Sequence, residues 1–151
     1  MRASTFFSDE QKRLIVSAIE EAEKCTSGEI RLHVEMRCHG DVMKRAVRVF
    51  QKLKMQRTQL RNGVLFYMAV SDRQFAIIGD AGINEMVPKG FWNDIEAHMS
   101  EMFAQGCFTE GVTDGIRMVG KQLQRFFPYQ PDDVNELSNE ISYGDGEKET
   151  E

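Results

Sequence analysis

The sequence predicts an α/β fold, a three-layer α/β/α sandwich built around a small mixed sheet. An alternating stretch over residues 29–36 and a hairpin over residues 61–83 supply the strands. Stretches with apolar residues at helical spacing precede, separate and follow these strands. A helix between two strands normally makes them parallel, whereas a two-residue loop makes them antiparallel, so the sheet combines both pairings. The predicted order of elements is αβαββαα.

The first third of the chain predicts a helix, a strand and a second helix. Ser8 and Gln11 form a capping-box pattern, and apolar residues at helical spacing continue from there to about Lys24. Residues 29–36 then alternate between apolar and polar types, as a strand packed on one face does. Asp41 can cap a second helix with one apolar stripe that reaches Leu53. This helix is the crossover between the first two strands.

The hairpin supplies the central strand of the predicted sheet. Residues 64–70 are seven consecutive apolar residues, too short a run for a typical helix and suited to a strand buried on both faces. Ser71 and Asp72 make a polar break, after which residues 75–78 resume the strand pattern. Residues 79–82, Gly-Asp-Ala-Gly, favour a loop. An acidic side chain between glycines at the end of a strand is often functional.

Two more helices and an acidic tail complete the chain. Pro88 fits the first turn of a third helix that stops at Gly106, and Thr109 can cap a fourth helix that ends before Pro128. We therefore divide the chain into a domain over residues 1–127 and an acidic tail over residues 128–151. The tail composition favours disorder. Four apolar residues nevertheless predict that part of it docks: Val134, Leu137, Ile141 and Tyr143.

Composition places the chain among small globular proteins. It has 151 residues, of which 41% are hydrophobic and 28% are charged, and its formal net charge is -5. Residues 128–151 hold eight acids and one lysine, which leaves 16 acids and 18 bases before them. No window has the ~18 apolar residues of a membrane helix, and no secretory segment opens the chain, so we expect a cytoplasmic protein. We also expect it to be a monomer. Three widely spaced cysteines predict neither a disulfide framework nor a thiolate zinc site.

The predicted topology brings polar side chains together at one edge of the sheet. The first two strands begin at this edge and the third ends there, which gathers Glu29, Asn62 and Asp80, with Asn84 close in sequence. Carboxylate and amide oxygens are the ligands that calcium and magnesium prefer. We therefore predict a site for a divalent cation, Ca²⁺ or Mg²⁺, formed by Glu29, Asn62, Asp80 and Asn84.

Other interpretations of the same residues remain open. Asn62 can belong to a tight turn with Gly63, Glu29 can cap backbone amides, and Asp80 can begin an Asx turn. The opposite edge of the sheet, where the parallel strands end, is where open α/β sheets usually bind ligands. Its polar residues are Arg37, His39, Ser71 and Asp72.

Five short segments in this order resemble the TPM domain family: residues 26–30, 61–65, 79–83, 91–92 and 103–111, which read TSGEI, RNGVL, GDAGI, FW and FAQGCFTEG. The likeness covers about residues 7–127, and the tail is similar to the extension of short stand-alone bacterial members. The resemblance implies an α/β/α sandwich, divalent-cation binding in some members, and an acid phosphatase activity in the plant branch.

Three hypotheses on function follow. The first is a cation-binding accessory or interaction module with an unknown protein partner. The second is a metal-dependent, acid-phosphatase-like hydrolase, in which Glu29 and Asp80 would hold the metal and one of them would act as a base. The third is a scaffold that needs no metal. A basic stripe on the second helix lacks interleaved aromatic residues, so nucleic-acid binding is not expected.

Overall fold

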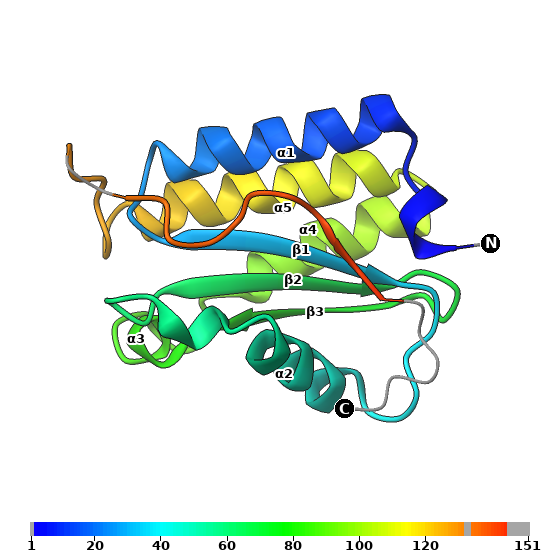
Figure 1. Cartoon of the computed structure of the whole chain (residues 1–151), viewed down its shortest axis with the longest axis horizontal. Helices are drawn as coiled ribbons and strands as arrows, with labels where there is room; N and C mark the ends of the chain where they lie inside the picture. The colour runs from blue at the N-terminus through cyan, green and yellow to red at the C-terminus, as the bar shows by residue number, and fades with distance from the viewer. Residues whose placement is uncertain (1, 132–133, 145–151) are drawn as a thin grey trace.

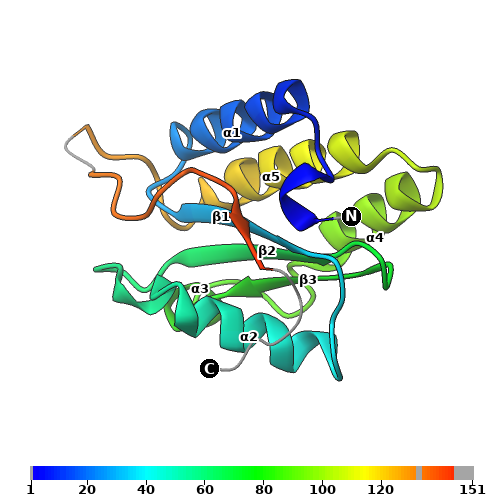
Figure 2. The same ribbon diagram turned by 45° about the vertical axis from the view of Figure 1, so that its right-hand side comes forward.

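The fold is a four-stranded sheet with helices on both faces (Figures 1 and 2). The computed structural model describes residues 2–131 and 134–144. The strand order is β3-β2-β1-β4, with bounds β1 Glu29–Glu35, β2 Gly63–Ala69, β3 Gln74–Gly79 and β4 Ser142–Tyr143. Strand β1 is parallel to both β2 and β4, and β2 is antiparallel to β3. The predicted three-layer sandwich with a mixed sheet is confirmed.

The helices divide unequally between the two faces of the sheet. Helices α1, α4 and α5 cover one face, and α2 covers the other (Figure 1). A short helix, α3, follows β3 directly, and two 3-10 turns complete the set. The bounds are η1 Ala3–Thr5, α1 Asp9–Glu23, α2 Val42–Lys52, η2 Met55–Arg57, α3 Ala81–Asn84, α4 Asn93–Ala104 and α5 Phe108–Leu123.

Two apolar clusters, one on each face of the sheet, form the core. The larger cluster joins alternate residues of β1 and β2, such as Leu32 and Phe66, to α1, α4 and α5. The smaller one joins Leu65 and Tyr67 to α2. All seven residues of β2 are buried, as expected for a central strand that is covered on both faces.

The sheet register aligns three strand ends at one edge. Glu29 lies opposite Gly63 in the parallel pair, and Val64 lies opposite Gly79 in the antiparallel pair. The backbone amide of Asp80 donates to the carbonyl of Gly63 over 3.0 Å, one step beyond the end of β3. The predicted meeting of these strand ends is therefore confirmed.

Local structure differs from the sequence prediction in the second half of the chain. The third long helix begins at Asn93 instead of Pro88, because residues 88–92 form successive turns in which Gly90 takes a φ of +80°. The predicted loop over residues 79–82 contains the start of α3, which Asp80 caps by accepting from the Ala81 amide. Helix α5 has Cys107, and not Thr109, at its N-cap position. In the described part of the chain, the helices lack the length and hydrophobicity that crossing a bilayer requires.

Residues 134–144, called the tail segment below, run along β1 in the same direction (Figure 2). They end in β4, where Ser142 lies opposite His33 and the Gly144 amide donates to the Val34 carbonyl over 3.0 Å. Leu137 packs against the smaller cluster, and Ile141 and Tyr143 pack against the larger one. The tail segment therefore covers the edge of β1 that would otherwise be open.

Candidate functional site

Strand β1 carries a buried carboxylate at each end. Glu29, at the amino-terminal end, is 5% exposed, and Glu35, at the carboxyl-terminal end, is 0% exposed. Since side chains alternate along a strand, residues 29 and 35 both lie on the face that α2 covers. Charged groups are rarely buried without compensation, so each carboxylate is expected to have hydrogen-bond or ion-pair partners.

Glu29 holds the beginning of the tail segment. Its Oε2 and Oε1 atoms accept from the backbone amides of Glu136 and Leu137, each over 3.2 Å. The backbone amide of Glu29 donates to the Asn62 carbonyl, also over 3.2 Å. The side chain of Glu29 thus joins β1 to backbone amides of the tail segment, which lies far from it in the sequence.

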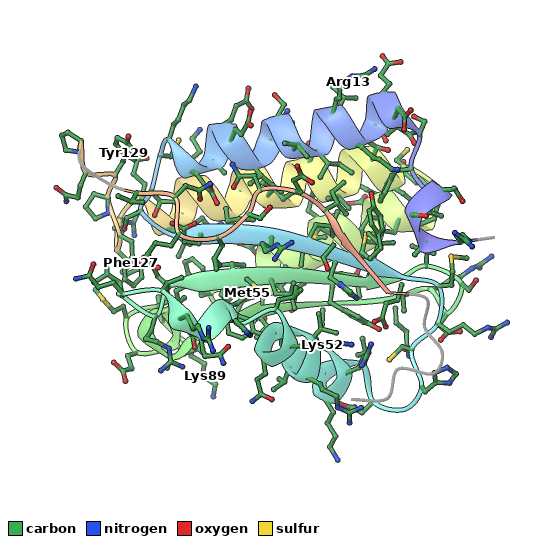
Figure 3. All side chains as sticks on the ribbon, in the orientation of Figure 1. Arg13, Lys52, Met55, Lys89, Phe127 and Tyr129 are labelled. Atoms are coloured by element: carbon green, nitrogen blue, oxygen red, sulfur yellow. The ribbon has the colours of Figure 1, made fainter. Side chains whose placement is uncertain are left out.

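A pocket of about 300 Å³ opens between the end of α1, the start of β1 and the tail segment. Tyr129 lines this pocket. Figure 3 shows the side chain of Tyr129 near the amino-terminal end of β1. Lys24 is the only cationic residue that lines it among the described residues. We call it the acidic pocket, because its other charged residues are carboxylates. Its ionisable and amide-bearing residues are Glu20, Glu23, Lys24, Glu29, Asn135 and Asn139.

Glu23 is the chemically unusual residue of the acidic pocket. Burial raises its pKa to about 8, and the nearby charges of Glu29 and Glu20 raise it as well. The Ile30 amide donates to its Oε2 atom over 2.9 Å, and Asn139 gives a second hydrogen bond, both of which oppose the rise. At neutral pH Glu23 therefore retains its proton, and the pocket has a carboxylate beside a carboxylic acid.

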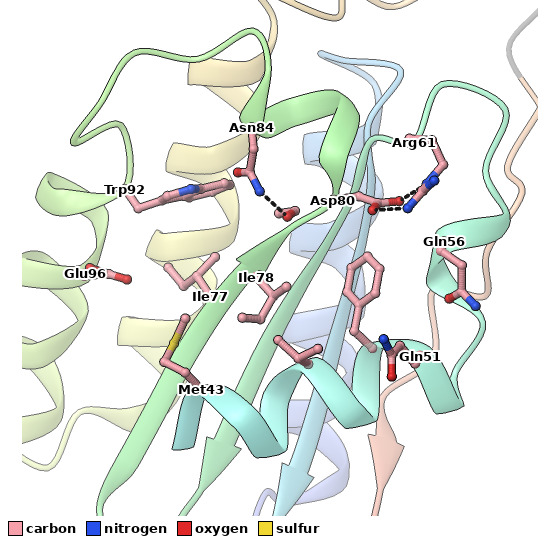
Figure 4. A pocket seen from close by; sticks show the side chains of 13 residues that line it. Met43, Gln51, Gln56, Arg61, Ile77, Ile78, Asp80, Asn84, Trp92 and Glu96 are labelled. Atoms are coloured by element: carbon pink, nitrogen blue, oxygen red, sulfur yellow. Dashed lines mark hydrogen bonds and ion pairs between the residues drawn. The ribbon is translucent and has the colours of Figure 1, made fainter. Parts of the chain in front are cut away.

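The structure places Asp80 and Asn84 in a different pocket (Figure 4). Asp80 is 6% exposed and forms a bidentate ion pair with Arg61, whose Nε and Nη2 atoms each lie 2.8 Å from a carboxylate oxygen. The Ala81 amide donates to the same carboxylate over 2.7 Å. Asn84 donates from Nδ2 to the Gly79 carbonyl over 3.0 Å.

Asn62 and Gly63 lie between these two pockets. Asn62 is 1% exposed, and its Nδ2 atom donates to the Ser27 hydroxyl over 3.4 Å. A Cβ atom on Gly63 would lie 3.2 Å from the Met55 carbonyl, so Met55 covers the strand between the side chains of Glu29 and Asp80. The topology brings the four predicted ligands to one edge but distributes Glu29, Asp80 and Asn84 between two pockets. Within the described residues, no group of three or more His, Cys, Asp or Glu has the arrangement of a metal site.

Sequence reasoning missed the network around Glu35. Arg45 of α2 donates to this carboxylate from Nε over 3.1 Å and also from Nη2, and the Tyr67 hydroxyl donates over 2.7 Å. Burial alone would raise the pKa of Glu35, but the hydrogen bonds from His33, Arg45 and Tyr67 outweigh it and lower the pKa to about 2. Burial and the bond to Glu35 together raise the pKa of the Tyr67 hydroxyl. The available signal was the position of Arg45, which follows Val42 by three residues and precedes Val49 by four and therefore falls on the apolar stripe of α2.

His33 links this network to the end of the tail segment. Its Nε2 atom lies 2.9 Å from Glu35 Oε2, and its Nδ1 atom lies 2.9 Å from the Ser142 hydroxyl. A serine, a histidine and a glutamate in a row resemble a hydrolase relay. Here, however, Glu35 is shared with Arg45 and Tyr67, and Ser142 belongs to a paired strand. The geometry is that of a structural connection between β4 and the sheet.

These features define a small α/β/α domain with an acidic pocket at one end of its central parallel pair and a closed ionic network at the other. The TPM domain family matches residues 2–122. The chain belongs to the TPM domain family. No curated protein matches it.

Solved structures agree with this assignment. The BA42 protein of the psychrophilic bacterium Bizionia argentinensis is 47% identical, with a TM-score of 0.88 over 92% of this chain and 96% of that one. An N-terminal domain from P. gingivalis is 16% identical, with a TM-score of 0.65 over 82% and 80% of the two chains. The N-terminal domain of cg2496 from Corynebacterium glutamicum is 12% identical, with a TM-score of 0.63 over 97% and 85%. The last two similarities show the fold alone.

Proposed function

We propose that this TPM domain is an accessory module that binds a divalent cation, calcium or magnesium, in the acidic pocket. Glu29, one of the four residues predicted from the sequence, is joined there by Glu23, which is not among those four. The observation that supports the proposal is the placement of these two carboxyl groups in one pocket with two asparagine side chains. All of these groups offer oxygen atoms, the donors that calcium and magnesium take.

The protonation of Glu23 supports a cation more than any other ligand. Burial, together with the nearby charges of Glu29 and Glu20, keeps a proton on Glu23, and a divalent cation can replace that proton. A phosphate group would meet the opposite situation, because the pocket has three glutamates and one lysine. The phosphatase alternative would therefore depend on the bound metal, with Lys24 as the one cationic side chain of the lining, to hold phosphoryl oxygens.

The acidic pocket also connects a cation to the tail segment. Glu29 accepts from two amides of this segment, and Asn135 and Asn139 belong to it. Occupation of the pocket would therefore add contacts between the sheet and residues 135–139. An accessory role follows from this link, since the surface formed by the tail segment would become more firmly held when the cation binds.

Calorimetric titration of the purified protein with CaCl₂ and with MgCl₂ tests the proposal. We expect a dissociation constant of about 10⁻⁴ to 10⁻³ M, the range of calcium sites in extracellular modules. The affinity should increase as the pH rises from 6 towards 8.5, because Glu23 must lose its proton, with about one proton released per cation. Glu23→Gln should weaken binding at least about tenfold.

Two variants decide between the acidic pocket and the other predicted ligands. Glu21→Gln is the matched control on α1, because Glu21 is exposed and pairs with Arg117 instead of lining the pocket. Asp80→Asn should also leave the affinity unchanged. If Asp80→Asn abolishes binding and Glu23→Gln does not, the cation binds beside Asp80 and Asn84. If neither salt gives heat or amide chemical-shift changes up to about 10 mM, well above the expected constant, the scaffold hypothesis replaces this one.

A further inference from the structure

The two outer edges of the sheet differ in whether another segment of the chain pairs with them. Strand β1 is covered on its outer side by β4 and the rest of the tail segment. Strand β3, at the other edge, pairs only with β2 among the described residues. One edge of the sheet is thus closed by the chain itself and the other is left open (Figure 2).

The open edge presents main-chain hydrogen-bonding groups. The Asp80 amide donates to the Gly63 carbonyl, so alternate residues of β3, at even positions, bond to β2. The backbone groups of Phe75 and Ile77 therefore point away from the sheet, and within the described residues they have no backbone partner on that side. The Gly79 carbonyl, which also points outward, is capped by Asn84.

Strand β3 lacks the features that normally protect an edge strand. Such strands commonly carry a lysine, a proline or a bulge that prevents another strand from pairing with them. The sequence of β3, Gln-Phe-Ala-Ile-Ile-Gly, has no charged residue and no proline, and its register with β2 is continuous from residue 74 to residue 79. The chain has therefore kept an edge that can accept another strand.

A groove of about 700 Å³ lies beside the second half of this edge (Figure 4). Ile77 and Ile78 of β3 line it, and Trp92 lies on the side of α4. On the side of α2 it is lined by Met43 and Val47, whose side chains are 49% and 43% exposed. A second hollow of about 470 Å³ begins at Gln74 and Phe75, so concave surface follows both halves of the strand. We call the first of these the edge groove.

One charge in the edge groove is not compensated. Asp80 is neutralised by Arg61, but the carboxylate of Glu96 has no hydrogen-bond or ion-pair partner within residues 2–131 and 134–144. Partial burial raises the pKa of Glu96, as expected for a carboxylate that has lost water without gaining a donor. A positively charged side chain placed opposite Glu96 would supply that donor.

We propose that the edge groove binds an extended segment of a partner protein, which adds to β3 as a fifth strand. The segment has apolar side chains at alternate positions, which contact Met43, Val47 and Ile78, and a lysine or arginine opposite Glu96. Its main chain bonds to the outward-facing groups of Phe75 and Ile77. Strand addition of this kind takes its affinity from the main chain and its specificity from the side-chain pockets.

Selection from a library of random seven-residue peptides displayed on phage tests the proposal. The expected peptides alternate β-branched or other apolar residues with polar ones and carry at least one basic residue. A synthetic copy of a selected peptide should shift the amide resonances of Phe75 and Ile77 and slow their hydrogen exchange. Methylation of the two peptide nitrogens that face β3 should weaken binding at least about tenfold, because it removes two hydrogen bonds and leaves the side chains intact.

Surface variants separate the edge groove from non-specific binding. Glu96→Gln should weaken the selected peptide about two- to fivefold, the size of an exposed ion pair, and Val47→Lys should weaken it further. Leu14→Lys is the matched control, because Leu14 is 49% exposed on α1 and outside the groove. The proposal is overturned if no peptide is enriched, if the enriched peptides are acidic, or if N-methylation has no effect. It is also overturned if the protein sediments as a dimer with Phe75 and Ile77 protected, since a second copy would then occupy the edge.

Discussion

The two ends of β1 compensate a buried carboxylate in opposite ways. Glu35 accepts hydrogen bonds from the guanidinium group of Arg45 and from the hydroxyl group of Tyr67, and its pKa falls to about 2. Glu29 accepts from neutral backbone amides and lies near a second acid, Glu23, whose pKa rises to about 8. The same residue type on the same face of one strand thus belongs to a closed ionic network at one end and to the acidic pocket at the other.

The difference follows from which elements meet at each end. Helix α2 places Arg45 over the carboxyl-terminal end of β1, and its ion pair with Glu35 satisfies both charges. At the amino-terminal end the last turn of α1 places Glu23 beside Glu29, and the tail segment adds two backbone amides and the side chains of Asn135 and Asn139. A buried arginine–carboxylate pair gives rigidity, whereas carboxyl groups gathered in a pocket that opens to solvent favour binding from solution.

The same substitution at both ends is the strongest test of this contrast. Glu35→Gln leaves Arg45 buried without its carboxylate, and we expect it to lower the free energy of unfolding by about 3–5 kcal/mol. Glu29→Gln, measured without divalent cations, should change it by less than about 1 kcal/mol, because an amide oxygen can still accept from the amides of the tail segment. Urea unfolding of both variants at pH 7 provides the measurement.

A double variant controls for effects other than charge. Glu35→Gln combined with Arg45→Met removes both charges, so part of the stability lost in Glu35→Gln should return. Equal losses for Glu29→Gln and Glu35→Gln would show that the two carboxylates contribute equally to the stability of the fold.

Most of the fold can be predicted from the sequence, but of the two carboxyl groups proposed to bind a cation only Glu29 can. The seven apolar residues from Val64 to Val70 predict a central strand, because the run is too short for a typical helix. The gathering of strand ends near Glu29 follows from connection rules alone. Glu23 could not be selected in this way. On α1 it is one acid among several, and its environment depends on Asn135 and Asn139, which are more than 100 residues away along the chain.

Tertiary packing also decides the role of Asp80 and Glu35. The position of Asp80 between glycines predicts a site residue, but its carboxylate already pairs with Arg61, whose backbone is left-handed with a φ of +52°. The sequence does not predict the role of Glu35, because a charged residue on an alternating strand usually faces water. Its burial depends on α2 and the tail segment lying over the same face.

The pH dependence of stability should differ in sign between the two ends. The raised pKa of Glu23 means that its contribution is fully present below its ordinary pKa of 4.5 and is lost as the pH rises through about 8. The lowered pKa of Glu35 means that its contribution is present above 4.5 and is lost as the pH falls towards 2. The wild-type protein should therefore lose on the order of 3 kcal/mol between pH 4.5 and pH 8.5 from Glu23 alone.

Glu23→Gln isolates that contribution. In urea unfolding without divalent cations, this variant should show a flatter stability profile between pH 4.5 and pH 8.5, while its loss of stability towards pH 2 stays as in the wild type. Glu21→Gln, on the same helix but paired with Arg117 at the surface, should keep the wild-type slope. Parallel profiles for Glu23→Gln and the wild type would mean that Glu23 titrates normally in the folded protein.

The smallest effects should appear in the tail segment, which both ends of β1 hold through different bonds. Glu29→Gln weakens the acceptors for Glu136 and Leu137, so exchange of these two amides should accelerate about fivefold, which corresponds to about 1 kcal/mol. Ser142→Ala removes the bond to His33 and should accelerate exchange at Gly144 instead. Hydrogen exchange followed residue by residue measures both. If either variant accelerates exchange along the whole segment, residues 134–144 open as one unit, and a cation near Glu29 would then also control the β4 end.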